Sequence, residues 1–294
     1  MLIRTFASAV TGIDAVTVRI EVNVSRGIRF FLVGLPDVAV KESQQRIESA
    51  LRTLGFHWPG KQVVINMAPA DIRKEGSSYD LPLATGILAA DEKISKVDLE
   101  SYVIMGELSL DGTLQPIKGV LPIALRARDE GFKGVIVPVK NAREAAVVSG
   151  IDVYGMEKLG DVVDFFNNLR KFESVKVDLI EIFKGEANKY DVDFSDVRGQ
   201  ENVKRALEVA AAGHHNLLMI GPPGSGKTML AKRLSTIMPP LTLEEALETT
   251  KIHSVAGKID DHTALMTRRP FRSPHHTISE QAFSSHTAIN LLSK

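Results

Sequence analysis

The stretch Gly221–Thr228 reads GPPGSGKT, and it decides how the second half of the chain is interpreted. It follows the apolar run 216–220 (NLLMI) and precedes a segment, 229–237, whose residues favour a helix. The glycines, the lysine and the threonine match the pattern GxxxxGK[ST] at every position. This order predicts a strand, a glycine-rich loop and a helix.

Such a loop suits a triphosphate, because backbone N–H groups at the start of a helix attract anions. The glycines let the backbone adopt the loop conformation. We expect Lys227 to reach the outer phosphates and the Thr228 hydroxyl to bind Mg²⁺. The alternative, a surface glycine turn, is disfavoured by the flanking strand and helix. With ATP and Mg²⁺ as cofactors, the predicted nucleotide-binding residues are Gly221, Pro222, Pro223, Gly224, Ser225, Gly226, Lys227 and Thr228.

The composition is that of a globular protein without a charge bias. The 294 residues are 44% hydrophobic, so the chain is expected to form more than one core. Lys+Arg and Asp+Glu balance at 36 each, so no global attraction for polyanions is expected. Cysteine is absent, which excludes disulfides and thiolate zinc sites and suits a reducing cytoplasm. The sequence has no signal-peptide pattern and no apolar run long enough for a membrane span, so we expect a cytoplasmic protein.

Predicted strands and helices alternate in the N-terminal half. Apolar residues recur at every second position over 16–24. Further strands are expected at 28–33, 63–67, 102–107, 134–138 and 151–154. Helices are expected at 39–53, 81–90, 120–130 and 142–148. This order predicts an α/β layered domain over residues 1–170.

A linker and a second domain are expected after residue 170. The regular pattern weakens over 171–192, where charged residues crowd together, so this segment is predicted to be the linker. The second domain, 193–294, opens with DFSDVRGQ at 193–200 and a helix at 201–212. That helix has an apolar stripe formed by Val203, Leu207 and Ala210.

Several motifs together resemble one family. In the second domain they are DVRGQ (196–200), HHNLLMIGPPGSGKTMLAKRL (214–234) and RPFRSPHHTIS (269–279). In the first they are GLPDVAVKESQQRIESAL (34–51), NMAPADIRKEGSSYDLPLATGIL (66–88) and GELSLDGTLQPIKGVLP (106–122). Over about residues 1–279 the chain resembles the ComM/YifB family of magnesium-chelatase-like AAA+ ATPases.

The resemblance implies both a fold and a function. The implied fold is a Lon-protease-like α/β domain followed by the N-terminal part of a P-loop AAA+ αβα domain. The implied function is a DNA-dependent ATPase or helicase, forming a homo-oligomeric, hexameric ring, that promotes branch migration in DNA uptake and recombination. Val197 and Gln200 are then expected on the adenine side of the nucleotide.

The resemblance weakens after Ser279. The family continues into an apolar strand ending in adjacent acidic residues, the Walker B element, followed by sensor residues and an arginine finger. This chain reads EQAFSSHTAINLLSK at 280–294 instead. A truncated, frame-shifted or split member would each read this way. We therefore assign no catalytic residue and expect ATP binding without hydrolysis.

The Lon-like domain raises the possibility of a Ser/Lys hydrolase. Such an enzyme needs a serine nucleophile activated by a nearby neutral lysine. Ser78 falls at or within one residue of the nucleophile position, but Leu121 stands where the lysine should be. Lys118 is three positions early, and Lys74 lies on another segment. The domain is predicted not to be a protease.

A local basic patch is the candidate DNA contact. It lies between Asp261 and Glu280, a span without acidic residues. Such a patch could bind a phosphate backbone. A solvated basic loop fits the charge equally well. Adjacent histidines on a strand point to opposite faces, so neither His214–His215 nor the pair in this patch predicts a metal site. The candidate DNA-binding residues are Arg268, Arg269, Arg272, His275 and His276.

Two classes of function stay open from the sequence. One is an ATP-driven DNA motor, favoured by the RPFRSPHH motif and the Lon-like domain. The other is a nucleotide-switched module acting on a protein partner, as a chelatase subunit does. DNA-stimulated ATP turnover by a full-length relative would favour the first, and dependence on a porphyrin-binding partner the second.

Overall fold

The computed structural model describes residues 2–186, 190, 192–260 and 263–271. The described residues form two compact units, one within Met1–Val177 and Thr250–Ala264 and the other within Asp178–Thr249 and Leu265–Lys294. Among the described residues, no helix is both long and apolar enough to cross a membrane. The α/β fold class predicted from the sequence is confirmed.

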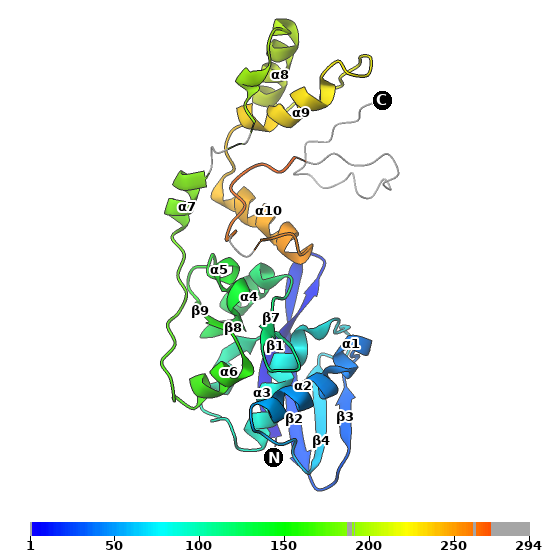
Figure 1. Cartoon of the computed structure of the whole chain (residues 1–294), viewed down its shortest axis with the longest axis vertical. Helices are drawn as coiled ribbons and strands as arrows, with labels where there is room; N and C mark the ends of the chain where they lie inside the picture. The colour runs from blue at the N-terminus through cyan, green and yellow to red at the C-terminus, as the bar shows by residue number, and fades with distance from the viewer. Residues whose placement is uncertain (1, 187–189, 191, 261–262, 272–294) are drawn as a thin grey trace. The chain divides into compact units, whose positions relative to one another are not determined.

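The first unit is built on a seven-stranded mixed sheet with the order β3-β4-β2-β1-β5-β8-β9 (Figure 1). β1 and β2 form an antiparallel hairpin, β4 runs antiparallel to β2, and the remaining neighbours are parallel. The strands are β1 (Leu2–Thr11), β2 (Asp14–Ser25), β3 (Phe30–Val33), β4 (Gln62–Ala68), β5 (Tyr102–Ile104), β8 (Gly134–Pro138) and β9 (Asp152–Met156). A separate ribbon pairs β6 (Glu107–Leu108) with β7 (Leu114–Gln115).

Helices pack on this sheet. They are α1 (Val38–Lys41), α2 (Ser43–Thr53), α3 (Asp80–Ala90), α4 (Val120–Asp129), α5 (Val139–Ala145) and α6 (Leu159–Phe166), with 3₁₀ turns η1 (Ser77–Tyr79) and η2 (Leu99–Ser101). Every residue of α3 is buried, and the helix packs against β1 and β2. A Cβ on Gly86 would come within 2.7 Å of Val22 Cγ2, so the glycine permits the close approach.

The last turn of helix α10 and the segment after it complete the first unit. Residues 250–264 were predicted in the second domain, but those that the structure describes, 250–260 and 263–264, pack with the first unit. The Gly119 N–H donates to the Ser254 carbonyl at 3.1 Å, and the Ser254 hydroxyl donates to the buried carboxylate of Glu144. Burial raises the pKa of Glu144, although the hydrogen bonds from Ser254 and from the Leu121 N–H oppose that rise. These buried polar contacts explain why the end of α10 packs with the first unit.

The second unit, in its described part, is helical. Its elements are α7 (Leu179–Glu186), η3 (Phe194–Asp196), α8 (Glu201–Gly213), α9 (Lys227–Leu234), η4 (Ser235–Ile237) and the first part of α10 (Leu243–Val255). Val197, Leu207, Ala211, Leu230 and Leu234 form its core. The core therefore joins η3, α8 and α9, the segments that flank the glycine loop.

The strand predicted at 216–220 is not formed. No element is assigned to these residues, and Leu218 and Ile220 are 70% and 86% exposed. A strand is stable only beside a hydrogen-bonded neighbour, and no described segment of this unit pairs with it. The prediction of a strand was wrong for this structure, whereas the loop and the helix after it are present.

Candidate functional site

The glycine loop leads directly into α9. Gly224 and Gly226 have φ values of +78° and +83°, a left-handed conformation that other residues adopt at a cost. Gly226 is the N-cap of α9, so the unpaired N–H groups of the first helical turn lie next to the loop. Backbone donors and a helix dipole at one point favour an anion.

Lys227 is the first residue of α9, and its ammonium group lies over the loop. The Nζ atom donates to the Gly221 carbonyl at 2.8 Å and to the Pro222 carbonyl at 3.0 Å. It also lies 3.4 Å from the Ser225 hydroxyl. The positive charge is thus held within the curve of the loop, where it can meet an anion. Thr228 follows it in the first turn of the helix.

The DVRGQ segment lies beside this loop. Val197 is 2% exposed and packs in the same core as Leu230 of α9. Gln200 adopts a left-handed conformation, with φ +56°, and is the N-cap of α8. Its Nε2 atom would lie 3.9 Å from a Cβ placed on Gly226. The structure therefore brings Gln200 next to the loop, while Val197 holds the segment in the core.

One supporting contact was not predicted. Arg233 Nε donates to the Asp193 carbonyl at 3.0 Å, and Nη2 donates to Asp196 Oδ2 at 3.1 Å. These bonds tie α9 to η3 and keep the DVRGQ segment beside the loop. Tertiary pairs of this kind leave no spacing signal in the sequence, although Asp193 and Asp196 could have been recognised as a turn that caps itself.

Only two residues of the predicted basic patch are described. Arg269 Nε donates to the Pro239 carbonyl at 2.9 Å, and Nη2 lies 3.2 Å from Glu245 Oε2. Its side chain is 14% exposed, so Arg269 joins two segments of the second unit rather than standing free in solvent. Arg268, the preceding residue, is partly exposed. Arg272, His275 and His276 lie outside the described residues.

The two histidines before the loop, His214 and His215, lie at the C-terminal end of α8. His214 ends α8 in a left-handed conformation, with φ +53°, and the ring of His215 lies against Gly213. Within the described ranges, no group of three or more His, Asp and Glu side chains could hold a metal ion.

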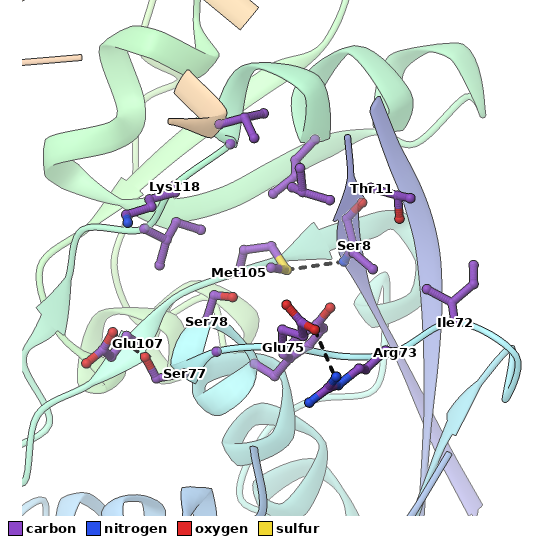
Figure 2. Close-up of a pocket in the computed structure, with 18 of the residues that line it drawn as sticks. Ser8, Thr11, Ile72, Arg73, Glu75, Ser77, Ser78, Met105, Glu107 and Lys118 are labelled. Atoms are coloured by element: carbon purple, nitrogen blue, oxygen red, sulfur yellow. Dashed lines mark hydrogen bonds and ion pairs between the residues drawn. The ribbon is translucent and has the colours of Figure 1, made fainter. Parts of the chain in front are cut away.

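The first unit contains a cavity of about 910 Å³ that includes Ser78 (Figure 2). Ser78 lies in η1, and its carbonyl accepts the Gly106 N–H at 2.9 Å. Lys118 lines the same cavity, and its side chain passes over Gly257. Leu121, which the resemblance places at the position of the lysine base, is fully buried in α4 and belongs to the hydrophobic core.

A serine-reactive probe is expected to leave Ser78 unlabelled. The resemblance places the buried Leu121 where the activating lysine would stand, so we expect the hydroxyl to lack the base that would make it a nucleophile. Incubation with a fluorophosphonate probe and with unfolded protein should give neither adduct nor cleavage, as checked by intact mass spectrometry. A Ser78→Ala variant is the matched control. Labelling that this substitution removes would show that another group, such as Lys118, activates the serine.

Together the two units define a class of protein: a Lon-like α/β domain joined to part of a chelatase-type P-loop NTPase. Residues 20–141 match the family model described as "Subunit ChlI of Mg-chelatase", and residues 193–288 match the one described as "Magnesium chelatase, subunit ChlI". The chain belongs to the magnesium-chelatase-like ComM/YifB family.

Three relatives illustrate this membership. The chain is 42% identical to "Competence protein ComM" of Haemophilus influenzae over 279 residues, 94% of this chain and 54% of the relative. It is 40% identical to "Uncharacterized protein YifB" of Escherichia coli over 283 residues, 96% and 54% respectively. It is 32% identical to "Lon protease 2" of Bacillus subtilis over 126 residues, 42% and 22%. The chain spans about half the length of the ComM and YifB relatives.

Proposed function

We propose that the second unit binds Mg·ATP through the loop at 221–228. The observation that carries this proposal is Lys227, whose ammonium is held over the glycine loop at the start of α9. Lys227 would hold the outer phosphates and Thr228 a Mg²⁺ ion, with Gln200 and the Val197 segment on the adenine side. When bound, Mg²⁺ would neutralise part of the phosphate charge. The chelatase-type family models support this use of nucleotide and metal.

We further propose that the chain serves a DNA-dependent ATPase or helicase of the ComM type, whether alone or as one part of it. It would act in the cytoplasm as a homo-oligomeric, hexameric ring and promote branch migration in DNA uptake and recombination. The support is the identity to a protein named for competence, together with the RPFRSPHH motif. Residues 280–294 contain no acidic pair after an apolar strand, so we propose that this chain binds ATP without hydrolysing it.

The DNA part of the proposal is tested by the salt dependence of binding. Replacing Arg268, Arg269 and Arg272 with alanine should weaken DNA binding and lower its salt slope by about 0.7 to 0.9 for each phosphate that the protein no longer neutralises. Fluorescence anisotropy with a branched DNA measures both quantities, in this chain and at matching positions of a full-length relative. Arg52→Ala removes an exposed arginine of α2 and is the surface-charge control.

The single variants separate two roles within the patch. Because Arg269 is paired with Glu245, Arg269→Ala alone should reduce the stability of the second unit more than the salt slope. A triple variant with the slope of the Arg52→Ala control would contradict the proposed DNA contact.

A second candidate function is a nucleotide-switched module acting on a protein partner. The family models named for the chelatase subunit support it. ATP turnover by a full-length relative separates the two, since stimulation by DNA favours the motor and stimulation by a protein partner alone favours the switch.

A further inference from the structure

The cavity of the first unit contains an open strand edge (Figure 2). β1 pairs with β2 along its whole length, but its other edge meets β5 only at Phe6, opposite Val103. Beyond that point, residues 8–12 line the cavity. In the part of the chain that the structure describes, no strand pairs with this stretch of the edge.

Strand geometry assigns the hydrogen-bonding groups of this edge. In an antiparallel pair, residues alternate between those that exchange two hydrogen bonds with their partner and those that exchange none. The Ser8 N–H points away from β2, because it donates to the Sδ atom of Met105 at 3.2 Å. By the same alternation, the N–H and C=O of Val10 face away from β2, toward the cavity.

The acceptor that Ser8 has found is a weak one. A thioether sulfur accepts hydrogen bonds poorly compared with a peptide carbonyl. An incoming backbone carbonyl would therefore give the Ser8 N–H a better partner, and Met105 could turn aside because its side chain is flexible. The exchange favours a ligand that brings its own peptide groups.

The cavity lining suits the side chains of such a ligand. Its apolar part includes Met105, Ile117, Ile123 and Val255. Arg73 and Glu75 at its edge form an ion pair at 3.3 Å, and Glu107 accepts the Ser77 hydroxyl, while Asp71 and Lys118 also line it. A volume of about 910 Å³ has room for several residues, within the usual range for ligand pockets.

We propose that the first unit binds an extended polypeptide segment by strand addition to the edge of β1 at Ser8–Val10. Backbone hydrogen bonds supply the affinity, and apolar side chains at alternate positions of the segment fill the cavity. The segment stays uncut, because Leu121 stands where a lysine base would be needed. This inference goes beyond the ATP and DNA functions proposed above and depends on neither.

The test uses the full chain and two Val10 variants. The probe is a fluorescein-labelled decapeptide of alternating valine and serine with terminal lysines. Its binding to the protein is measured by fluorescence anisotropy. Val10→Pro removes the cavity-facing N–H and should weaken binding about five- to tenfold. Proline is tolerated there because that N–H makes no bond to β2. Val10→Thr keeps the N–H and a β-branched side chain, and should bind as the wild type does.

A second measurement avoids any risk that the proline variant misfolds. Wild-type protein is titrated with peptides carrying one N-methyl group at successive backbone positions. Strand addition predicts that methylation weakens binding at every second position only. Equal affinity for the Val10→Pro and Val10→Thr variants, no period of two in the methylation scan, or no binding of the probe would each overturn the proposal.

Discussion

Replacing Lys227 with alanine is expected to lower the affinity for Mg·ATP by at least about tenfold, which corresponds to about 1.4 kcal/mol. The ammonium lies over the loop, held by the carbonyls of Gly221 and Pro222, so it is positioned for the charge-assisted bonds that phosphates accept. The substitution removes no core contact, since Leu230 and Leu234 hold α9 in the core. Isothermal titration calorimetry measures the affinity, and thermal melting checks the fold.

Lys232→Ala provides the matched control for this experiment. Lys232 is an exposed residue of the same helix, so the control removes the same charge outside the loop. An equal loss of affinity in both variants would show that Lys227 acts only through its long-range charge and not through direct contact with the phosphates. A phosphate-release assay accompanies the titration. Turnover that Lys227→Ala abolishes would contradict the proposal that this chain binds ATP without hydrolysing it.

Local patterns predicted most of the first unit. The helix predicted at 81–90 is α3 (Asp80–Ala90), and the strand predicted at 134–138 is β8. Helix α6 was missed because it is only eight residues long, although its buried apolar residues, Leu159, Val162, Val163 and Phe166, have helical spacing. The strand predicted at 216–220 was wrong, since its formation depends on neighbouring strands and not on its own apolar residues.

The candidate sites also differ in whether local sequence could predict them. The loop residues were predicted because their chemistry requires adjacent positions in the sequence. The contact between Arg233 and Asp196 was not, because those residues lie 37 positions apart. Buried charges were missed for another reason: a charged residue normally indicates a solvent-exposed position. Lys74 and Asp80 contradict that expectation, since both are fully buried.

Asp80 shows how the first unit accommodates such a charge. Arg46 Nε donates to Asp80 Oδ2 at 2.6 Å and Nη2 donates to Oδ1 at 2.9 Å, a bidentate pair. The Leu108 N–H adds a bond at 3.2 Å. Burial still raises the pKa of Asp80, with Arg46 and Leu108 opposing that rise. The carboxylate at the start of α3 therefore depends on Arg46 for its charge compensation.

Arg46→Ala is expected to destabilise the first unit by about 3 to 5 kcal/mol at pH 8, because it leaves a buried carboxylate without its partner. Arg52→Ala, on the same helix, should cost less than about 1 kcal/mol, since that arginine forms an exposed pair with Glu48. Urea unfolding, followed by circular dichroism, measures both. Similar losses in the two variants would show that the buried pair contributes no more than a surface one.

The pH dependence of this loss identifies its cause. Without Arg46 the pKa of Asp80 should rise further above its ordinary value of 3.8, so the folded state then takes up a proton that the unfolded state does not. A raised folded pKa gives stability that is present below the unfolded pKa and is lost as the pH rises through the folded pKa. Arg46→Ala should therefore cost less at pH 5 than at pH 8. In an Asp80→Asn background, where no proton can be taken up at this position, that difference should disappear. A loss that is the same at both pH values would mean that Arg46 acts through packing and its bond to the Ala39 carbonyl, and not through the charge of Asp80.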